Sequence, residues 1–388
     1  MTVERPLACV IGDMDLVRPL GLAGIRCAVV ARRDDPVTFS RFTHLWLEQR
    51  ELWDDPESQV RALVDFGASA ASPPVLFYQG DPDALMVSRF RDVLGRWFRF
   101  VVPDADLMED LVDKARFTAL ARRLDLPVPA ATHLRTAEDQ APDDLVLPLV
   151  VKPLVRRSET WEGLTGGAKA FRVETRDELR RLWERLADAG MEVIVQEAVA
   201  GAEHRIESYH VYVDADGRIA GEFTGAKLRT HPATYGHSTA LRTTDAPDVA
   251  RLGREVVGRL GLRGVAKVDI KRALDGRLWV LEINPRFTLW HHLGAVAGLN
   301  VPAIVYADLA GLPRPPRRRV RAGVGWSAPL TDLTAAREAG RSAAASALWT
   351  ARCRAVSGLA VDDPWPFLRG QRWPRLGRRL RTHASARP

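Results

Sequence analysis

Lysine is scarce in this 388-residue chain. Of its 56 basic residues only six are lysine, and all lie between positions 114 and 271: Lys114, Lys152, Lys169, Lys227, Lys267 and Lys271. Lysine presents a compact point charge and arginine a planar fork, so the two are not interchangeable. A chain that carries almost all its positive charge on arginine is expected to keep lysine where an ammonium group is needed, although codon bias alone would also leave few lysines.

Long apolar runs and paired cysteines are also missing. No stretch of about eighteen apolar residues occurs, so no transmembrane segment is expected. The initial segment MTVERPLACV contains an acidic residue and lacks the basic-then-apolar layout of a signal peptide. The three cysteines, Cys9, Cys27 and Cys353, are odd in number and far apart, which argues against a disulfide framework and for a cytoplasmic protein.

Several nucleotide-binding and nucleophile motifs are absent. Gly12, Gly21 and Gly24 do not fit the G-x-G-x-x-G spacing of a dinucleotide site. No G-K-[ST] follows at the spacing of a Walker A loop, and no G-x-S-x-G elbow or cysteine in a polar context offers a nucleophile. Rossmann dehydrogenases, P-loop enzymes and α/β-hydrolases are therefore not expected.

Charge is distributed unevenly along the chain. Residues 311–388 contain 16 arginines and 4 acidic residues, a net charge of +12, so the remaining residues sum to −5 of the overall +7. The segment 312–388 therefore forms a basic C-terminal extension. Its tryptophans favour packing onto the acidic body, whereas the helical spacing of Trp373, Leu376 and Leu380 among arginines leaves contact with an acidic partner or an anionic membrane as the alternative.

The alternation of strand and helix signals predicts an α/β protein. A length of 388 residues suits two or three domains. Strand-like runs at 7–12, 26–31 and 74–80 alternate with helical segments, which favours an N-terminal parallel sheet. An amphipathic helix is expected over 110–124. A smaller α/β unit follows it, with strands at 147–153, 168–173 and 192–199, a glycine-containing loop at 156–167 and a helix at 176–190.

The segment VAKVDIKRALDGRLWVLEINPR predicts a hairpin with an unusual face. Asp275-Gly276 between two alternating runs is a strong signal for a two-residue turn. That turn would place Asp269 opposite Glu282 on one face of the sheet, with Lys267 opposite Asn284 one pair further along. Opposed carboxylates are destabilising unless something binds them, and converging oxygen ligands suit Mg²⁺, whose coordination is usually completed by phosphates. A solvated sheet face with tolerated charges is the alternative.

Asp269, Glu282 and Asn284, followed by Arg286, resemble the metal-binding strands of ATP-grasp enzymes. The Lys152 strand, the loop 157–167 and VQEAVAG at 195–201 resemble the rest of that nucleotide site. GDPDALMVSRFRDVL, DKARFTALARRLDLPVPA and KLRTHPATYGHST are similar to amino-acid ligases of the D-aspartate ligase type. The resemblance covers about 110–310. It implies an N-terminal α/β (pre-ATP-grasp) domain at 1–108, a two-lobed ATP-grasp fold at 109–311 with a lid lobe at about 126–195, and the extension at 312–388.

The resemblance implies a role for each candidate residue. Lys114 and Lys152 would contact ATP phosphates, the loop 157–167 would close over them, and Asp269, Glu282 and Asn284 would bind Mg²⁺, with Mn²⁺ as an alternative. The strand containing Gln196, Glu197 and Val199 would meet the adenine edge, and Glu203 the ribose hydroxyls. The catalytic cations would be Lys227, Arg229 and Arg286, which would hold the transferred phosphoryl group or the substrate carboxylate. Lys227 and Arg229 alternate on one strand, so both are expected to point the same way. Surface positions are the alternative for Glu203, Arg229 and Arg286.

The expected activity is an ATP-dependent ligase that joins a carboxylate to an amine through an acyl phosphate, giving an amide, ADP and phosphate. The partners would be small-molecule substrates, in particular amino acids, and a homo-oligomer is compatible with the sequence. Two alternatives stay open: an ATP-grasp enzyme with a non-amine acceptor, such as a carboxylase or thiol ligase, and a non-catalytic nucleotide-binding protein whose basic tail holds an acidic partner. No specific nucleic acid is expected, because no aromatic base-stacking platform is present.

Overall fold

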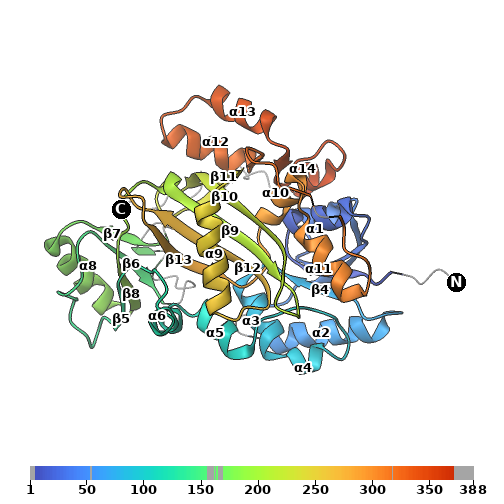
Figure 1. Cartoon of the computed structure of the whole chain (residues 1–388), viewed down its shortest axis with the longest axis horizontal. Coiled ribbons are helices and arrows are strands. Elements are labelled where there is room, and N and C mark those ends of the chain that lie inside the picture. The colour runs from blue at the N-terminus through green and yellow to red at the C-terminus, as the bar shows by residue number, and fades with distance from the viewer. Residues whose placement is uncertain are drawn as a thin grey trace, which may run out of the picture.

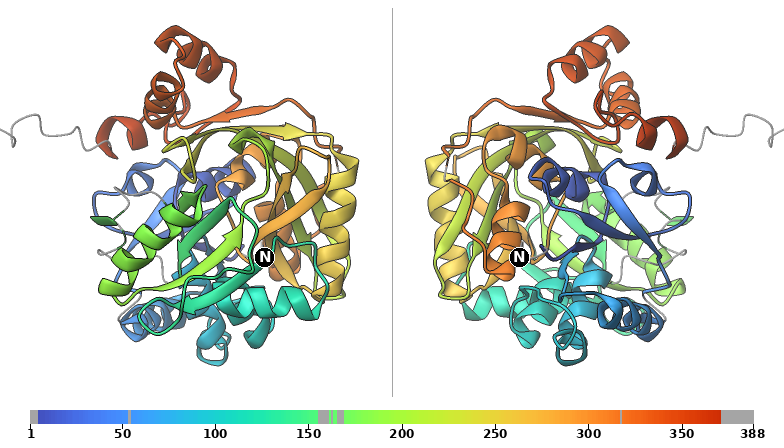
Figure 2. Two further views of the ribbon diagram at one scale, coloured as in Figure 1. Left: turned by 90° about the vertical axis from the view of Figure 1, so that its left-hand side faces the viewer. Right: turned by 90° about the vertical axis from the view of Figure 1, so that its right-hand side faces the viewer.

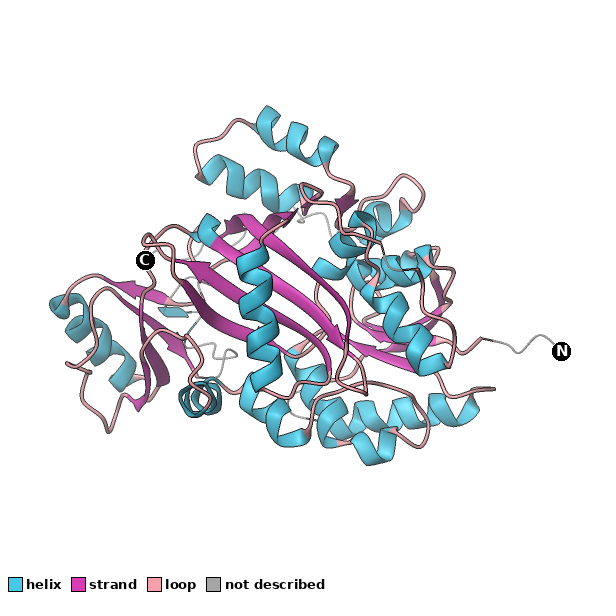
Figure 3. Cartoon of the chain, in the orientation of Figure 1, coloured by secondary structure: helices cyan, strands magenta, loops and turns pink. Residues whose placement is uncertain are grey.

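The computed structural model describes residues 5–52, 55–154, 161, 163–164, 169–316 and 318–370. Within these residues the strands form three sheets, of four, seven and four strands. Figure 1 shows the seven-stranded sheet through the middle of the molecule, the small four-stranded sheet at one end and the N-terminal sheet at the other. Figure 3 shows the same layers by secondary structure, with helices against the central sheet.

The N-terminal sheet is parallel, with strand order β3-β2-β1-β4. Its strands are β1 (Ala8–Ile11), β2 (Cys27–Ala31), β3 (Thr43–Glu48) and β4 (Val75–Tyr78). The helices between and after them are α1 (Met14–Leu22), α2 (Pro56–Ser69), α3 (Asp81–Arg89) and α4 (Arg91–Leu94). The predicted parallel α/β unit is confirmed. The sequence reading missed β3, an edge strand that lacks the apolar run of the buried ones.

The helix expected over 110–124 is two helices, so that prediction was wrong. α5 (Ala105–Val112) ends before Asp113, and α6 (Lys114–Arg123) begins after it. Asp113 has an extended backbone conformation and its carboxylate accepts from the backbone N–H of Arg116, which makes it the N-cap of α6. The cap places Lys114 in the first turn of α6, and its Nζ donates to the carbonyl of Leu154, 2.9 Å away.

The small sheet is antiparallel, with strand order β5-β8-β6-β7. Its strands are β5 (Ala131–Arg135), β6 (Leu149–Pro153), β7 (Phe171–Val173) and β8 (Glu192–Glu197). The amphipathic helix α8 (Arg176–Asp188) buries Leu179, Leu182 and Leu186 against it and starts with a capping box of Thr175 and Glu178. The α/β unit expected from the sequence is present, but the sequence reading missed its edge strand β5.

The large sheet has strand order β13-β12-β9-β10-β11-β14-β15. Its strands are β9 (Ile206–Val213), β10 (Ile219–His231), β11 (His237–Thr244), β12 (Gly264–Arg272), β13 (Leu278–Asn284), β14 (Gly325–Ser327) and β15 (Ala355–Val356). α9 (Pro247–Arg259) packs on one face through Val249, Val256 and Val257. α10 (Trp290–Ala297) and α11 (Val301–Ala310) lie between the other face and the N-terminal sheet.

One apolar core joins the large sheet to the N-terminal sheet. Phe77 of β4 lies 5.1 Å from Phe287, measured between ring centroids, and Trp290 of α10 is fully buried in the same cluster. Gly225 on β10 is required here, because a Cβ at that position would lie 2.3 Å from the Trp290 ring. The two units therefore form one packed body, which fixes the end of β13 relative to the N-terminal sheet.

The segment after α11 packs onto this body. β14 extends the large sheet beside β11, and the Trp326 indole is buried in the shared core. The helices that follow are α12 (Pro329–Glu338), α13 (Ala343–Arg352) and α14 (Trp365–Gly370). Figure 2 shows α12 and α13 on the outside of the sheet layers. As far as residue 370, the extension therefore folds back onto the body, as the sequence favoured.

No single helix among the described residues is both long and apolar enough to cross a membrane. α10 and α11 meet that criterion only when taken together, and they are bent by 91° relative to each other.

Candidate nucleotide and metal site

The predicted acid pair forms on the β12–β13 hairpin. Asp269 is directly opposite Glu282, and Lys267 is opposite Asn284, as predicted. The turn, however, is not the predicted two-residue turn. Ala273 N–H donates to the Arg277 carbonyl at 2.8 Å, which leaves three residues in the loop, and Gly276 has a φ of +88°. The register near the turn is shifted by one residue, and a β-bulge between Val280 and Glu282 restores it before the acid pair.

Asp269 is buried under two lysines. Its Oδ2 lies 3.0 Å from Nζ of Lys227 and 2.8 Å from Nζ of Lys267, and its Oδ1 accepts from the Ser208 hydroxyl at 2.6 Å. Lys227 comes from β10, Ser208 from β9 and Lys267 from β12, so three adjacent strands contribute to one cluster. The repulsion expected between Asp269 and Glu282 is therefore offset by positive charge within the protein.

The lysines and carboxylates of the cluster shift one another's pKa values. Burial alone would raise the pKa of Asp269, but Lys227 and Lys267 hold that pKa well below its ordinary value. Burial alone would lower the pKa of Lys227, but the carboxylates of Asp269 and Glu282 outweigh burial and raise it. Both groups are therefore ionised throughout the physiological pH range.

Lys152 brings a third ammonium group from the small sheet. Its Nζ donates to Oε1 of Gln196 on β8 at 2.9 Å. Burial lowers the pKa of Lys152, and the carboxylates of Glu282 and Glu203 act on it in the opposite direction. The electrostatic contact between Lys152 and Glu282 shows that the cluster lies where the small and large sheets face each other.

The other residues that were expected to border the nucleotide are Glu197, Val199 and Glu203. Glu197 accepts from the backbone N–H of Val146 at 2.8 Å, so its side chain fixes the entry to β6. Val199 is half-buried just beyond the end of β8. Glu203 lies in the short 3-10 turn Glu203–Arg205, and its charge reaches Lys152 and Lys227. Most of the loop 157–167 falls outside the described residues.

Arg286 lies beside the acid pair and joins it to the N-terminal sheet. Its Nη2 donates to Oδ1 of Asn284 at 3.1 Å, and its Nε donates to the carboxylate of Asp81 at the start of α3. The Asn284 amide in turn donates to Glu282 at 3.2 Å. The guanidinium is thus held at the edge of the cluster by a residue of the GDPD segment.

Arg229 is placed differently from the expectation that it points the same way as Lys227. The strand is irregular between Lys227 and Arg229. The Arg229 guanidinium makes two bonds of 2.7 Å to Asp332 of α12, whose carboxylate is fully buried. Thr239 and Ser346 donate to the same carboxylate at 3.0 and 2.9 Å. Arg229 therefore ties the C-terminal segment to β10, and the structure does not bring it to the acid pair.

Asp332→Asn should destabilise the protein by about 3 kcal/mol, because it leaves the Arg229 guanidinium, only 12% exposed, without its counter-charge. Chemical denaturation would measure the loss. Asp216→Asn is the matched control, since Asp216 pairs with Arg218 at 2.7 Å but both side chains are largely exposed. The control should cost less than about 0.5 kcal/mol. Equal losses in the two variants would contradict a structural role for the buried pair.

The acid pair has the ligand chemistry that Mg²⁺ prefers. Asp269 and Glu282 offer carboxylate oxygens and Asn284 an amide oxygen. Among the described residues no three His, Cys, Asp or Glu side chains gather into a closed metal site. Two carboxylates leave coordination positions for phosphate oxygens and water, which is the usual way Mg²⁺ is bound. Glu282 is exposed, whereas Asp269 is covered by lysines, so Glu282 is the more accessible donor.

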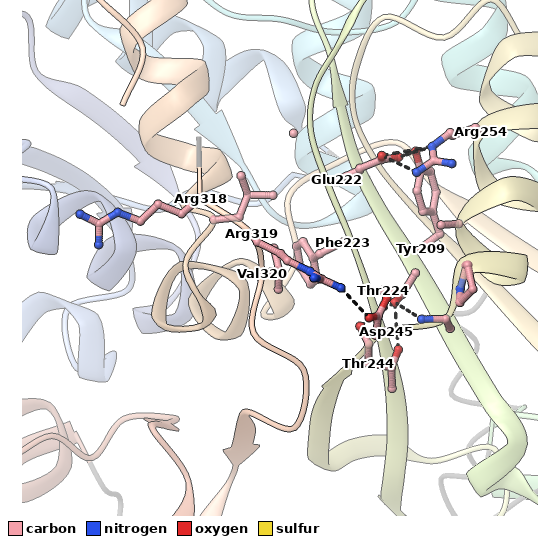
Figure 4. A pocket seen from close by; sticks show the side chains of 15 residues that line it. Tyr209, Glu222, Phe223, Thr224, Thr244, Asp245, Arg254, Arg318, Arg319 and Val320 are labelled. Carbon is pink, nitrogen blue, oxygen red and sulfur yellow. Dashed lines mark hydrogen bonds and ion pairs between the residues drawn. The ribbon is translucent and has the colours of Figure 1, made fainter. Parts of the chain in front are cut away.

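A large pocket elsewhere in the molecule is not this site. It has a volume of ≈ 480 Å³ and is lined by β9 and β10, the start of α9 and residues 318–320. Tyr209, which lines the pocket, directly follows Ser208, which donates to Asp269, so these two side chains point to opposite faces of β9. Figure 4 shows two ion pairs in its lining, Glu222 with Arg254 and Asp245 with Arg319.

The sequence reading assigned no role to Lys267. It placed Lys267 opposite Asn284 but did not connect it with Asp269, two residues away on the same strand. Alternation puts residues i and i+2 on one face, and Lys267 is one of only six lysines. Those two facts together could have identified it as the second cation on Asp269.

Comparison with known proteins agrees with the geometry. Residues 111–289 match the ATP-grasp domain family. The chain is 25% identical over 264 residues to D-aspartate ligase of Enterococcus faecium (strain Aus0004), a match covering 65% of this chain and 62% of the relative. It is also 25% identical over 219 residues to D-alanine–D-alanine ligase of Pseudomonas putida (strain GB-1), covering 51% and 64%. The matches thus span less than two thirds of either ligase.

A similar fold occurs among solved structures. The ADP complex of N5-carboxyaminoimidazole ribonucleotide synthetase superposes with a TM-score of 0.63 and 15% sequence identity, over 84% of this chain and 82% of that chain. The predicted fold, an N-terminal parallel α/β unit followed by a two-lobed ATP-grasp fold, is confirmed. The predicted resemblance to carboxylate–amine ligases of the D-aspartate ligase type is confirmed as well.

Proposed function

We propose that this chain, whose residues 111–289 match the ATP-grasp domain family, is an ATP-dependent ligase that joins a carboxylate to an amine. The similarity to D-aspartate ligase and D-alanine–D-alanine ligase supports this class of reaction. In the proposed reaction a carboxylate oxygen attacks the γ-phosphorus of ATP and ADP leaves. The amine nitrogen then attacks the acyl carbon, phosphate leaves, and the amine loses a proton as the amide forms.

The single observation that carries the proposal is the concentration of lysines. A chain with 50 arginines and six lysines places Lys152, Lys227 and Lys267 around one pair of carboxylates. Compact ammonium groups neutralise phosphate oxygens without the geometric demands of a guanidinium. Phosphoryl transfer asks for positioning and charge neutralisation rather than for a protein nucleophile, and this cluster provides both.

The nucleotide would lie between the small and large sheets. Lys114 and Lys152 would contact its phosphates, Gln196, Glu197 and Val199 would border the adenine, and Glu203 would accept from the ribose. Asp269, Glu282 and Asn284 would hold Mg²⁺, which supplies charge neutralisation at the phosphates when bound.

The substrate carboxylate would lie next to Arg286, at the junction with the N-terminal sheet. Arg286 is held by Asp81 and Asn284, so its guanidinium is positioned between α3 and the acid pair. Lys227 and Lys267 would then stabilise the negative charge that develops as the phosphoryl group moves. For Arg229 we propose support of β10, on which Lys227 lies, in place of substrate contact.

The substrates we propose are small amino acids, used in the cytoplasm where ATP is available. The direct test is an ADP-release assay over pairs of amino acids. ADP should form only when both a carboxylate and an amine are supplied. Release with bicarbonate or a thiol as the sole acceptor would instead support a carboxylase or a thiol ligase.

Lys152→Ala and Lys114→Ala should each weaken ATP binding at least tenfold, about 1.4 kcal/mol. Each removes an ammonium group from the phosphates. Lys152→Arg should not restore the affinity, because a planar fork replaces a point charge in a tight site. Isothermal calorimetry measures the affinities. Values within about twofold of the wild type for both alanine variants would contradict the assignment.

The affinity for ATP should also fall as the pH rises, and this fall should begin below the ordinary pKa of lysine. Burial lowers the pKa of Lys152 from 10.5, so the free enzyme loses this charge at a lower pH than an exposed lysine would. ATP favours the protonated form, and its affinity is therefore lost as pH rises through that lowered pKa. Calorimetry from pH 7.5 to 10 should show the decline in the wild type and a smaller one in Lys152→Arg. The same decline in both proteins would exclude Lys152 as its source.

A further inference from the structure

The two edges of the N-terminal sheet differ in what lies against them. The strand order β3-β2-β1-β4 makes β3 and β4 the edge strands. The β4 edge is covered by the main chain of Arg99, whose carbonyl accepts from the Leu76 N–H at 2.8 Å and whose N–H donates to the Pro74 carbonyl at 2.9 Å. Among the described residues, no main-chain hydrogen bond reaches the outer edge of β3 over residues 45–48. A free strand edge is a template for pairing with a further strand.

The hydrogen-bonding groups that β3 presents outward can be identified from its pairing with β2. The Gln49 N–H donates to the Ala31 carbonyl of β2 at 3.0 Å, so the main chain of Gln49 is turned inward. The register with β2 is regular over residues 45–48. Because main-chain groups of successive residues point alternately to the two sides of a strand, Trp46 and Glu48 present their N–H and C=O groups to the free edge.

The outward edge of β3 also exposes apolar side chains. Leu45 and Trp46 are 46% and 39% exposed. The Trp46 ring is held in place, because its Nε1 donates to the Ala31 carbonyl at 2.9 Å. Proteins commonly protect such an edge with proline or lysine, and the strand sequence THLWLE contains neither. β3 therefore has the features of a strand that pairs with a partner.

We propose that β3 pairs with β3 of a second copy of this chain, antiparallel and about a two-fold axis at Trp46. This register brings the outward main-chain groups of the two strands opposite each other. It places Trp46 opposite Trp46 of the second copy, Leu45 opposite Leu47, and Glu48 opposite His44. Aromatic, aliphatic and oppositely charged cross-strand pairs each stabilise a sheet. The segment is thus complementary to itself, which favours a second copy over an unrelated strand.

The proposed dimer would leave the N-terminal sheet without a free edge. Two four-stranded sheets joined at β3 form one sheet of eight strands, and both of its outer strands are β4. Each β4 edge is already covered by Arg99 of the same chain. A two-fold contact of this kind is closed, so assembly should stop at two chains.

Sedimentation equilibrium of the full chain tests the proposal. The expected mass is twice the 43.0 kDa of one chain. Glu48→Pro should weaken dimerisation at least about a hundredfold, because it removes an outward N–H from each of the two strands. Proline is tolerated on an edge strand where the N–H faces away from the sheet, so the far-UV circular dichroism should be unchanged.

Trp46→Lys should also give a monomer, because it places two ammonium groups opposite each other at the axis. Leu274→Lys is the matched control, since Leu274 is 69% exposed in the loop between β12 and β13, away from the N-terminal sheet. This variant should dimerise like the wild type.

Trp46→Cys tests the register. In a hydrogen-bonded antiparallel pair the Cα atoms are about 5.5 Å apart, which is within the range of a disulfide. Mild oxidation should therefore join two chains of this variant covalently, and Leu274→Cys should remain uncrosslinked.

A full chain that is monomeric at micromolar concentrations overturns the proposal. So does a dimer whose affinity is unchanged in Glu48→Pro, or a Trp46→Cys variant that forms no covalent dimer. A monomeric full chain together with a dimeric chain ending at Gly370 would overturn it in favour of the chain's own last residues as the occupant of the edge.

Discussion

Glu282→Gln is expected to lower turnover at least a thousandfold, about 4 kcal/mol of transition-state stabilisation, while the fold stays intact. Glu282 is exposed and its side chain accepts a hydrogen bond from the Asn284 amide, which a glutamine carbonyl can also accept. The substitution therefore removes the accessible negative charge of the proposed metal site and little else. Steady-state ADP release measures the effect, and the thermal transition monitors the fold.

Asp275→Asn is the control for that prediction. It removes one carboxylate from the tip of the same hairpin, where Asp275 accepts from the backbone N–H of Arg277 at 3.0 Å. Turnover should be unaffected, because the tip lies away from the lysine cluster. If Glu282→Gln turns over ATP at the normal rate, Glu282 is not a metal ligand.

Deletion of residues 313–388 should yield an insoluble or inactive protein. The deletion removes β14 from the edge of the large sheet and the buried Trp326 from the shared core. It also removes the Trp326 N–H and Ser357 hydroxyl donors at 2.9 and 2.7 Å from the buried carboxylate of Asp15. The combined loss is comparable to the entire stability of a typical domain, about 5–15 kcal/mol.

The chain that ends at Gly370 separates the two parts of the extension. It keeps β14, the helices α12 to α14 and the contacts of Trp326 and Ser357 to Asp15, and should be as stable and as active on small substrates as the full chain. Solubility on expression, circular dichroism and ADP release would compare the two deletions. A soluble and fully active protein lacking residues 313–388 would mean that the extension is a separate recruitment device and not part of the fold.

The features that could be predicted from the sequence are those that depend on local residue patterns, such as the pairing of two strands of a hairpin. Alternation and a turn signal placed Asp269 opposite Glu282, although a three-residue turn and a bulge, in place of a two-residue turn, produce that register. A bulge leaves no clear signal in a single sequence, because it depends on how the strand packs against its neighbours. The break between α5 and α6 did carry a signal: Asp113 is a favourable N-cap, but the amphipathic pattern continues through it.

Long-range pairing was the part that the sequence could not supply. Arg229 and Asp332 are 103 residues apart, and nothing local indicates that α12 would return to β10. The same holds for Arg286 and Asp81, which are 205 residues apart. Residue type and strand position identified the charged side chains, but the tertiary fold decides whether a cation faces a substrate or a carboxylate of the protein.

The most direct test of the central claim is isotope transfer from the substrate. A carboxylate substrate identified in the ADP-release screen would be labelled with ¹⁸O and incubated with the enzyme, ATP, Mg²⁺ and the amine. Mass spectrometry should find one ¹⁸O atom in each phosphate released and an amide product formed in equal amount to ADP. Unlabelled phosphate, or ADP release without an amide, would contradict ligation through an acyl phosphate.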